Sequence, residues 1–409
     1  MAGRYDAAMR ASPWICLLSL VVWIPACDGD GDTPALVWLS PLPGAEVAGA
    51  VRLQVNGLQT ATLYVDAVGP AGEIAVVEPG AEVPWFSPDV ANGPHTLIAR
   101  AGTLEVRLDV TVANTTYEDT VPPGAVKITP GTDQHPPLLE PAFQNMFEAP
   151  VPLGAPINLA GAEDSPYITS DGQSLYFWYT PDPQVPVQDQ LLDGATGIYW
   201  SRWNGAQWSP PERVFLNYHD EPALDGCETV YGNTMWFCTV RAGNLREIDV
   251  WTAGFDGAHW SNWQNAGARL NLEIGLGEMH VSNGGDTITF HSDLPAGGVG
   301  AMDIWTTTHD GTDWGDPVNL TPVNTTINDG WPWVSEDDTE MFLTTGAGAP
   351  EIWRSVKVGG VWQAPEKVLG PFAGEATLDG SGDLYFVHHF WDDATNSMLE
   401  ADIYVARRK

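Results

Sequence analysis

Positive charge is scarce in this chain. Lysine and arginine together number 17, against 53 aspartate and glutamate residues, which gives a formal net charge of −36 at pH 7. Such a surface repels the phosphate backbone, so the composition excludes nucleic acid as a partner. The acidic excess suits an exported protein that is kept in solution by charge spread over a large surface, or one that attracts cations.

Long apolar runs are also missing, with one exception near the N-terminus. Arg4 and Arg10 precede an apolar stretch over residues 14–26, which is too short to span a bilayer and has the layout of a secretory signal. Residues 24–27 read IPAC and resemble a bacterial lipobox, in which Cys27 becomes lipidated. We therefore predict a lipoprotein signal peptide over residues 1–26 and an acidic tether over 27–33. The alternative is a plain signal peptide cleaved near Ala26.

Cysteine is rare as well. Cys16 would leave with the signal and Cys27 would carry the anchor, so Cys227 and Cys238 remain. If residues 232–233 (GN) form a two-residue hairpin turn, the strand register places Cys227 directly opposite Cys238. Cross-strand Cα separations of about 5.5 Å lie within disulfide range. The sequence predicts this disulfide, with two buried free thiols as the alternative.

Residues 34–114 form a first predicted module. Val51, Leu53 and Val55 alternate with polar residues, and residues 95–100 and 104–110 continue the pattern between Gly, Pro and Asn turns. Short alternating strands over about eighty residues are typical of a β-sandwich. The pattern resembles the bacterial immunoglobulin-like modules of surface proteins, which implies a spacer. Residues 115–147 are rich in proline and predict a linker.

The remaining residues, 148–409, contain a tandem repeat. A pair formed by Ile or Val and an aromatic residue returns at intervals of roughly fifty residues, the spacing of β-propeller blades. The pairs are Ile198-Tyr199, Val250-Trp251, Ile304-Trp305, Ile352-Trp353 and Ile403-Tyr404. Each repeat reads as four short strands. Most of the tryptophans recur at fixed places in the repeats, which predicts that they pack between neighbouring sheets.

The repeat motifs carry a family resemblance. Residues 380–386 (GSGDLYF) and 401–404 (ADIY) resemble the WD40-like repeats of bacterial envelope propellers, the group that includes TolB-type proteins. The resemblance spans about residues 149–409 and implies an all-β propeller in a bacterial envelope lipoprotein.

The last repeat ends after its third strand. Residues 149–159 resemble residues 316–320, the outer strand of the third repeat, so we predict that they supply the missing fourth strand and close the ring. This gives an all-β chain with an immunoglobulin-like sandwich followed by a five-bladed propeller. Six blades would result if residues 115–147 contained a degenerate blade.

Acidic residues stand near the start of the predicted inner strand of every repeat. They are Glu163, Asp164, Asp220, Glu221, Glu278, Asp329 and Glu375. His280 shares a strand face with Glu278, and His219 directly precedes Asp220. In a propeller these positions converge around one mouth of the central channel, where Trp331 would also lie.

Carboxylates gathered in a narrow channel repel one another, and three interpretations follow. In the first, the acids accept backbone hydrogen bonds in the turns that lead into each blade. In the second, they bind a polar ligand or a cation, with Glu278, Asp329 and Glu375 as candidate calcium ligands; no other cofactor is expected. In the third, Glu221, Glu278 and Glu375 are catalytic candidates in a glycoside hydrolase, although no motif of such enzymes is present.

The sequence thus predicts an exported, membrane-anchored lipoprotein of the bacterial cell envelope, monomeric, that binds an envelope protein or a glycan through its propeller. The alternative is a glycan-acting hydrolase that uses carboxylates at the channel mouth. Two carboxylates about 5–10 Å apart in an open pocket would favour the hydrolase. A narrow mouth would favour the binding module.

Overall fold

The computed structural model describes residues 36–293, 296–346 and 348–409. The predicted signal peptide, Cys27 and the acidic tether lie outside this part of the chain. Within it, none of the helices has the length and apolar character needed to cross a membrane.

The first module consists of two sheets that share one apolar core. One sheet contains β1 (Val37–Ser40), β3 (Ala50–Asn56) and β6 (Glu82–Phe86), with η2 (Ser87–Asp89) following β6. The other contains β2 (Glu46–Val47), β8 (Leu104–Val112), β7 (Gly93–Ala101), β4 (Ala61–Val65) and β5 (Glu73–Val77). Alternation fixes which side chains face the core, because successive strand residues point to opposite sides. Leu53 and Val55 are buried accordingly, as are Leu108 and Val110 of β8.

The repeat array is built from antiparallel four-stranded meanders. The first meander contains β11 (Ala162–Ile168), β12 (Ser174–Thr180), β13 (Gly197–Arg202) and β14 (Glu212–Arg213), and the second contains β15 (Ala223–Tyr231), β16 (Thr234–Arg241), β17 (Asp249–Phe255) and β18 (Trp260–Asn265). The third contains β19 (Met279–Ser282), β20 (Thr287–Ser292), β21 (Asp303–Thr308) and β22 (Val318–Asn319), and the fourth contains β23 (Asp329–Val334), β24 (Glu340–Thr345), β25 (Glu351–Val358) and β27 (Glu366–Gly370). The last contains β28 (Ala373–Leu378), β29 (Leu384–Asp392) and β30 (Ser397–Ala406). Short elements between them are α2 (Val187–Gln190), η4 (Arg269–Ile274), η5 (Asn283–Gly285) and β26 (Val361–Trp362).

The repeat motifs fill the core of the meanders in the same way each time. The Ile or Val of the third strand is fully buried at residues 198, 250, 304, 352 and 403, and so is the Phe of the second strand at residues 177, 237, 290, 342 and 386. Burial of each such side chain contributes about 1.5–3 kcal/mol. The all-β propeller-type fold predicted from the repeats is confirmed.

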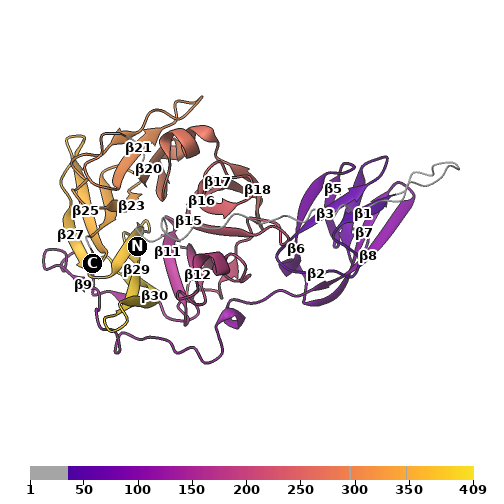
Figure 1. Ribbon diagram of the computed structural model, residues 1–409, viewed down its shortest axis with the longest axis horizontal. Coiled ribbons are helices and arrows are strands. Elements are labelled where there is room, and N and C mark those ends of the chain that lie inside the picture. Colours follow the sequence, from indigo (N-terminus) through magenta and orange to yellow (C-terminus); the bar gives the residue numbers. More distant parts are fainter. Residues whose placement is uncertain (1–35, 294–295, 347) are drawn as a thin grey trace. The chain divides into compact units, whose positions relative to one another are not determined.

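The segment ahead of the first meander completes the last one. β10 (Val151–Pro152) pairs antiparallel with β30, with Val151 opposite Val405. The Asn158 side chain accepts a hydrogen bond from the Ile403 N–H and donates one to its carbonyl. Further along the same edge of β30, β11 forms a parallel bridge between Ala162 and Ala401, so the first and last meanders lie side by side (Figure 1). The predicted role of residues 149–159 is therefore confirmed.

Residues 115–147 pack against the array instead of forming a free linker. They contain η3 (Glu118–Thr120) and β9 (Leu138–Leu139), and β9 pairs with β27. The side chains of Tyr117, Phe143 and Phe147 are buried in the cores of the meanders. We call residues 115–147 the strap.

Candidate functional site

A bulge recurs in the inner strands of the meanders. The strand register shifts in β11, β15, β23 and β28, and one residue in each bulge has a left-handed backbone: Ser165, Cys227, Trp331 and Glu375, with φ between 47° and 57°. Positive φ is uncommon for residues other than glycine. A bulge re-aims the side chain that it carries, and here the bulged residues of neighbouring meanders come together.

These residues line a small, open cavity of about 50 Å³ at the inner strands. Glu278, which directly precedes β19, lies in the same ring of positions. The cavity is lined by Ser165, Pro166, Tyr167, Cys227, Glu228, Glu278, Met279, His280, Trp331, Pro332, Trp333, Glu375, Ala376 and Thr377. We call it the channel cavity.

Burial keeps protons on the carboxyl groups of the channel cavity. It raises the pKa of Glu278 to about 8, although a hydrogen bond with the Cys227 thiol opposes the shift. Burial also raises the pKa of Glu228 well above its usual value. The pKa of Glu375 is raised well above its usual value by burial and by the negative charges of Asp164 and Glu278. The cavity therefore holds carboxyl groups that are largely neutral at neutral pH.

Two histidines beside the cavity are neutral for the same reason. Burial lowers the pKa of His280 and of His291 to about 4. The Nδ1 atom of His280 accepts a hydrogen bond from the Val334 N–H (3.3 Å), and the Trp331 N–H donates to His291 Nδ1 (3.4 Å). Neither imidazole supplies a positive charge to balance the acids.

Several predicted site residues meet in this cavity. Glu278, His280, Trp331 and Glu375 all line it. Asp164 stands one position before the bulge of β11, with its Oδ1 atom 3.5 Å from His389 Nε2, and it acts on the cavity through its charge.

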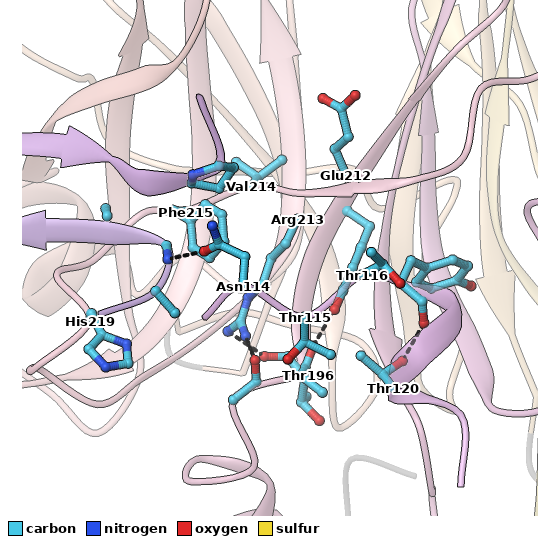
Figure 2. Close-up of a pocket in the computed structure, with 18 of the residues that line it drawn as sticks. Asn114, Thr115, Thr116, Thr120, Thr196, Glu212, Arg213, Val214, Phe215 and His219 are labelled. Atoms are coloured by element: carbon cyan, nitrogen blue, oxygen red, sulfur yellow. Dashed lines mark hydrogen bonds between the residues drawn. The ribbon is translucent and has the colours of Figure 1, made fainter. Parts of the chain in front are cut away.

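His219, Asp220 and Glu221 do not reach the channel, which corrects their predicted placement. They precede β15, and the carboxyl-bearing side chains of Asp220 and Glu221 are 59% and 56% exposed. Figure 2 shows His219, Arg213, Val214 and Phe215 among the residues that line a different pocket. The Arg213 guanidinium donates to the Thr196 carbonyl (2.9 Å). The reason is register: the position of β15 that corresponds to Glu278 and Glu375 is Cys227, several residues further along.

Asp329 and Glu163 satisfy backbone groups instead of facing the cavity. Both are fully buried. The Asp329 carboxylate accepts hydrogen bonds from the N–H and the hydroxyl of Thr325. Glu163 Oε1 accepts from the Tyr117 hydroxyl (2.6 Å) and from the Leu159 N–H (3.1 Å).

The calcium ligand set suggested by the sequence is not assembled. Asp329 does not join Glu278 and Glu375 at the channel cavity, because its carboxylate is turned towards Thr325. Across residues 36–409, gaps excepted, no three or more His, Cys, Asp or Glu side chains are grouped so that they could hold a metal ion.

The predicted disulfide between Cys227 and Cys238 is wrong: both are free thiols. The hairpin itself forms as predicted, with Tyr231 opposite Thr234. The bulge between Gly226 and Thr229 then breaks the register, so Cys238 pairs with Gly226 and Cys227 turns into the channel cavity. A hydrogen bond with Cys238 and burial raise the pKa of the Cys227 thiol well above its usual value.

The sequence analysis did not identify Glu228 or His291, and it did not place Cys227 at the cavity. A glycine before the bulge position was the available signal, since it recurs at residues 226, 277, 330 and 374. At Gly277 and Gly330 the reason is close approach. A Cβ would lie 2.4 Å from His291 Cδ2 at Gly277 and 2.9 Å from His291 Nδ1 at Gly330.

Comparison with known proteins gives weak structural likenesses. No protein-family model matches the chain, and no curated protein does. TolB from Acinetobacter baumannii is 11% identical, with 78% of this chain and 77% of that chain covered and a TM-score of 0.35. A gluconolactonase from Xanthomonas campestris is 12% identical, with 67% and 95% covered and a TM-score of 0.36. The NanB sialidase from Streptococcus pneumoniae is 8% identical, with 76% and 63% covered and a TM-score of 0.36.

Proposed function

We propose that this chain is an exported, envelope-anchored binding lipoprotein that recognises a protein or glycan partner through a five-bladed propeller. The apolar stretch ahead of Cys27 and the acidic tether behind it support the anchor. The strand pairing of the meanders, with β10 completing the last, supports the closed ring.

The small volume of the channel cavity favours binding over hydrolysis. Its volume of about 50 Å³ has room for only a few water molecules, since one water needs about 10–15 Å³ of such space. Sites for small organic ligands usually enclose about 300–1,000 Å³. A glycosidase must place a sugar between two carboxyl groups, and the channel acids leave no room for one.

A partner surface is available at the end of the array where the inner strands begin. In an antiparallel meander the connection from the second to the third strand lies at the end where the first strand starts. Exposed apolar side chains stand on these connections and before β23: Leu245, Ile248, Val299 and Ile327, with 37–48% of their surface exposed. Exposed apolar side chains grouped on one face are typical of binding surfaces. We call them the apolar loop residues.

The charge of the chain indicates what kind of protein would bind there. The net charge of −36 favours the approach of a positively charged partner through long-range attraction. We therefore favour a protein partner that presents apolar side chains within a basic surround. The alternative partner is a glycan, and the experiment below distinguishes the two.

A photoreactive residue tests this surface directly. With benzoylphenylalanine in place of Leu245, irradiation of the anchored protein in its own envelope should yield a discrete cross-linked protein. The matched control is the same residue in place of Val361, which is 57% exposed on the connection between third and fourth strands, at the opposite end. Adducts of equal yield from both positions would reject the surface. Absence of protein adducts together with saturable binding on a glycan array would make the partner a glycan.

One specific observation supports the hydrolase alternative, namely the raised pKa of the Glu278 carboxyl. A pKa of about 8 lies in the range that suits a general acid. We expect wild-type protein and the Glu278→Gln variant alike to release no reducing ends from a glycan panel. Hydrolysis by the wild type that falls about 10²–10⁴-fold in Glu278→Gln would establish the enzyme instead.

A further inference from the structure

Glu228 is the one carboxyl group among the described residues of the channel cavity with both oxygens unpartnered. Its side chain lines the cavity, and only 5% of the residue is exposed. Neither Oε1 nor Oε2 has a hydrogen-bond partner. A buried polar group left unsatisfied costs about 1–3 kcal/mol. Exceptions in a native fold therefore call for a missing partner.

The surroundings of Glu228 offer two further carboxyl groups, and the side-chain donors that line the cavity, such as the unpartnered Nε1 of Trp331, are neutral. Glu375 Oε2 is also buried without a partner, and the Glu278 carboxyl lies in the same cavity. Among the described residues that line the cavity there is no lysine or arginine. Because the described lining residues supply no cationic side chain, a positively charged donor of several hydrogen bonds would satisfy these oxygens.

The walls of the cavity favour an organic cation. Tyr167, Trp331 and Trp333 line it together with the carboxyl groups. Aromatic faces attract ammonium groups, by about 0.5–2 kcal/mol according to how far the site is desolvated. A cavity of about 50 Å³ admits an ammonium head, which is close to water in size, and the start of its methylene stem.

We propose that the channel cavity binds a primary alkylammonium group. The carboxyl groups of Glu228, Glu278 and Glu375 accept its N–H donors, and the positive charge of the ammonium favours release of their protons to solvent as it binds. The stem then leaves the cavity between the aromatic side chains. Two sources carry this chemistry, a free amine and the lysine side chain of a bound protein. The site does not depend on the partner surface proposed above, since it is built from different residues.

Calorimetric titration with n-butylammonium tests the site on the mature protein. The expected result is saturable binding, with n-butanol, the neutral analogue, binding at least about tenfold more weakly. Glu228→Gln should weaken n-butylammonium binding about tenfold or more, because one receiving charge is lost. Glu221→Gln, which neutralises an exposed acid of the array, should leave it unchanged. Glu375→Gln provides a second lining variant, and a thermal melt of each variant establishes that it is folded.

The two sources are separated by a second ligand. Nα-acetyl-lysine-N-methylamide, titrated in parallel, should bind more tightly than n-butylammonium if the natural occupant is a protein lysine. Equal or weaker binding assigns the site to free amines. The proposal is overturned if the wild type shows no saturable binding, if n-butanol binds as well, or if folded Glu228→Gln and Glu375→Gln both bind like the wild type. None of these outcomes bears on cross-linking through Leu245.

Discussion

Protonated carboxyl groups inside the channel link the stability of this protein to pH. The folded-state pKa of Glu278 is about 8, raised by burial from 4.5. Below about pH 4.5 both the folded and the unfolded chain hold the proton, and its contribution is fully present. Between pH 4.5 and 8 the folded chain binds the proton and the unfolded chain releases it. Stability therefore falls as pH rises through this window.

The Glu278→Gln variant isolates that contribution. In the wild type, the free energy of unfolding should fall by up to about 1.4 kcal/mol per pH unit for this group between pH 5 and 8. This loss per pH unit is an upper bound because Glu278 is partly exposed. Urea unfolding followed at pH 5, 6, 7 and 8 should give a shallower decline for Glu278→Gln. Identical pH dependence in the two proteins would show that Glu278 does not titrate as described.

Single residues also show where sequence reasoning stopped. Glu278 and Glu375 could be placed in the channel because each stands near the start of a predicted inner strand. Glu228 could not, because it lies one position beyond the bulged residue Cys227. A one-residue bulge reverses the direction of every later side chain, and no propensity of Cys or Glu indicates one. The same bulge explains the failure of the predicted disulfide.

At the scale of elements, the strap behaves as part of the array. Lys127 pairs with Glu400 and Asp402 of β30, whose carboxyl groups are almost fully buried. Burial raises the pKa of Asp402 to about 7, even though Lys127 opposes the shift. His388 Nε2 lies 2.9 Å from Asp133 Oδ2, and both side chains are buried. Polar pairs with such low exposure hold the strap in one place.

Composition could not reveal the strap. Its prolines and weak periodicity are typical of a linker, and its attachment depends on isolated side chains. Tyr117, Phe143 and Phe147 each insert into a core that other elements form. Contacts of this kind have no period along the sequence, whereas the repeats do.

Replacement of Lys127 by methionine should loosen the strap. The change keeps the apolar stem and leaves Glu400 and Asp402 without their cation, which should cost about 3 kcal/mol in the free energy of unfolding. Amide hydrogen exchange in residues 121–137 should accelerate. Lys357→Met is the matched control, since its partner Asp338 is 61% exposed, and it should cost less than about 1 kcal/mol. Equal losses in the two variants would contradict the role assigned to Lys127.

At the scale of the whole molecule, the tandem repeat produces the series of meanders, and residues 149–159 complete the last of them. The periodic Ile/Val-aromatic pairs made the meanders predictable because each pair occupies the same buried place in its sheet. The likeness of residues 149–159 to an outer strand made the closure predictable as well. The convergence of the inner strands on one cavity depends on that closure. The channel carboxyl groups meet because the first and last meanders are held side by side.

Disulfide trapping between β10 and β30 measures the closure most directly. Val151 and Val405 lie opposite each other in this antiparallel pair, and cross-strand partners at about 5.5 Å between Cα atoms can be bridged. In the double variant Val151→Cys, Val405→Cys, mild oxidation followed by peptide mass spectrometry should recover one cross-linked peptide that joins residues 151 and 405. The pair Val151→Cys, Val361→Cys should give none. Separate, unbridged peptides from the first variant would contradict the closed ring and the channel cavity that depends on it.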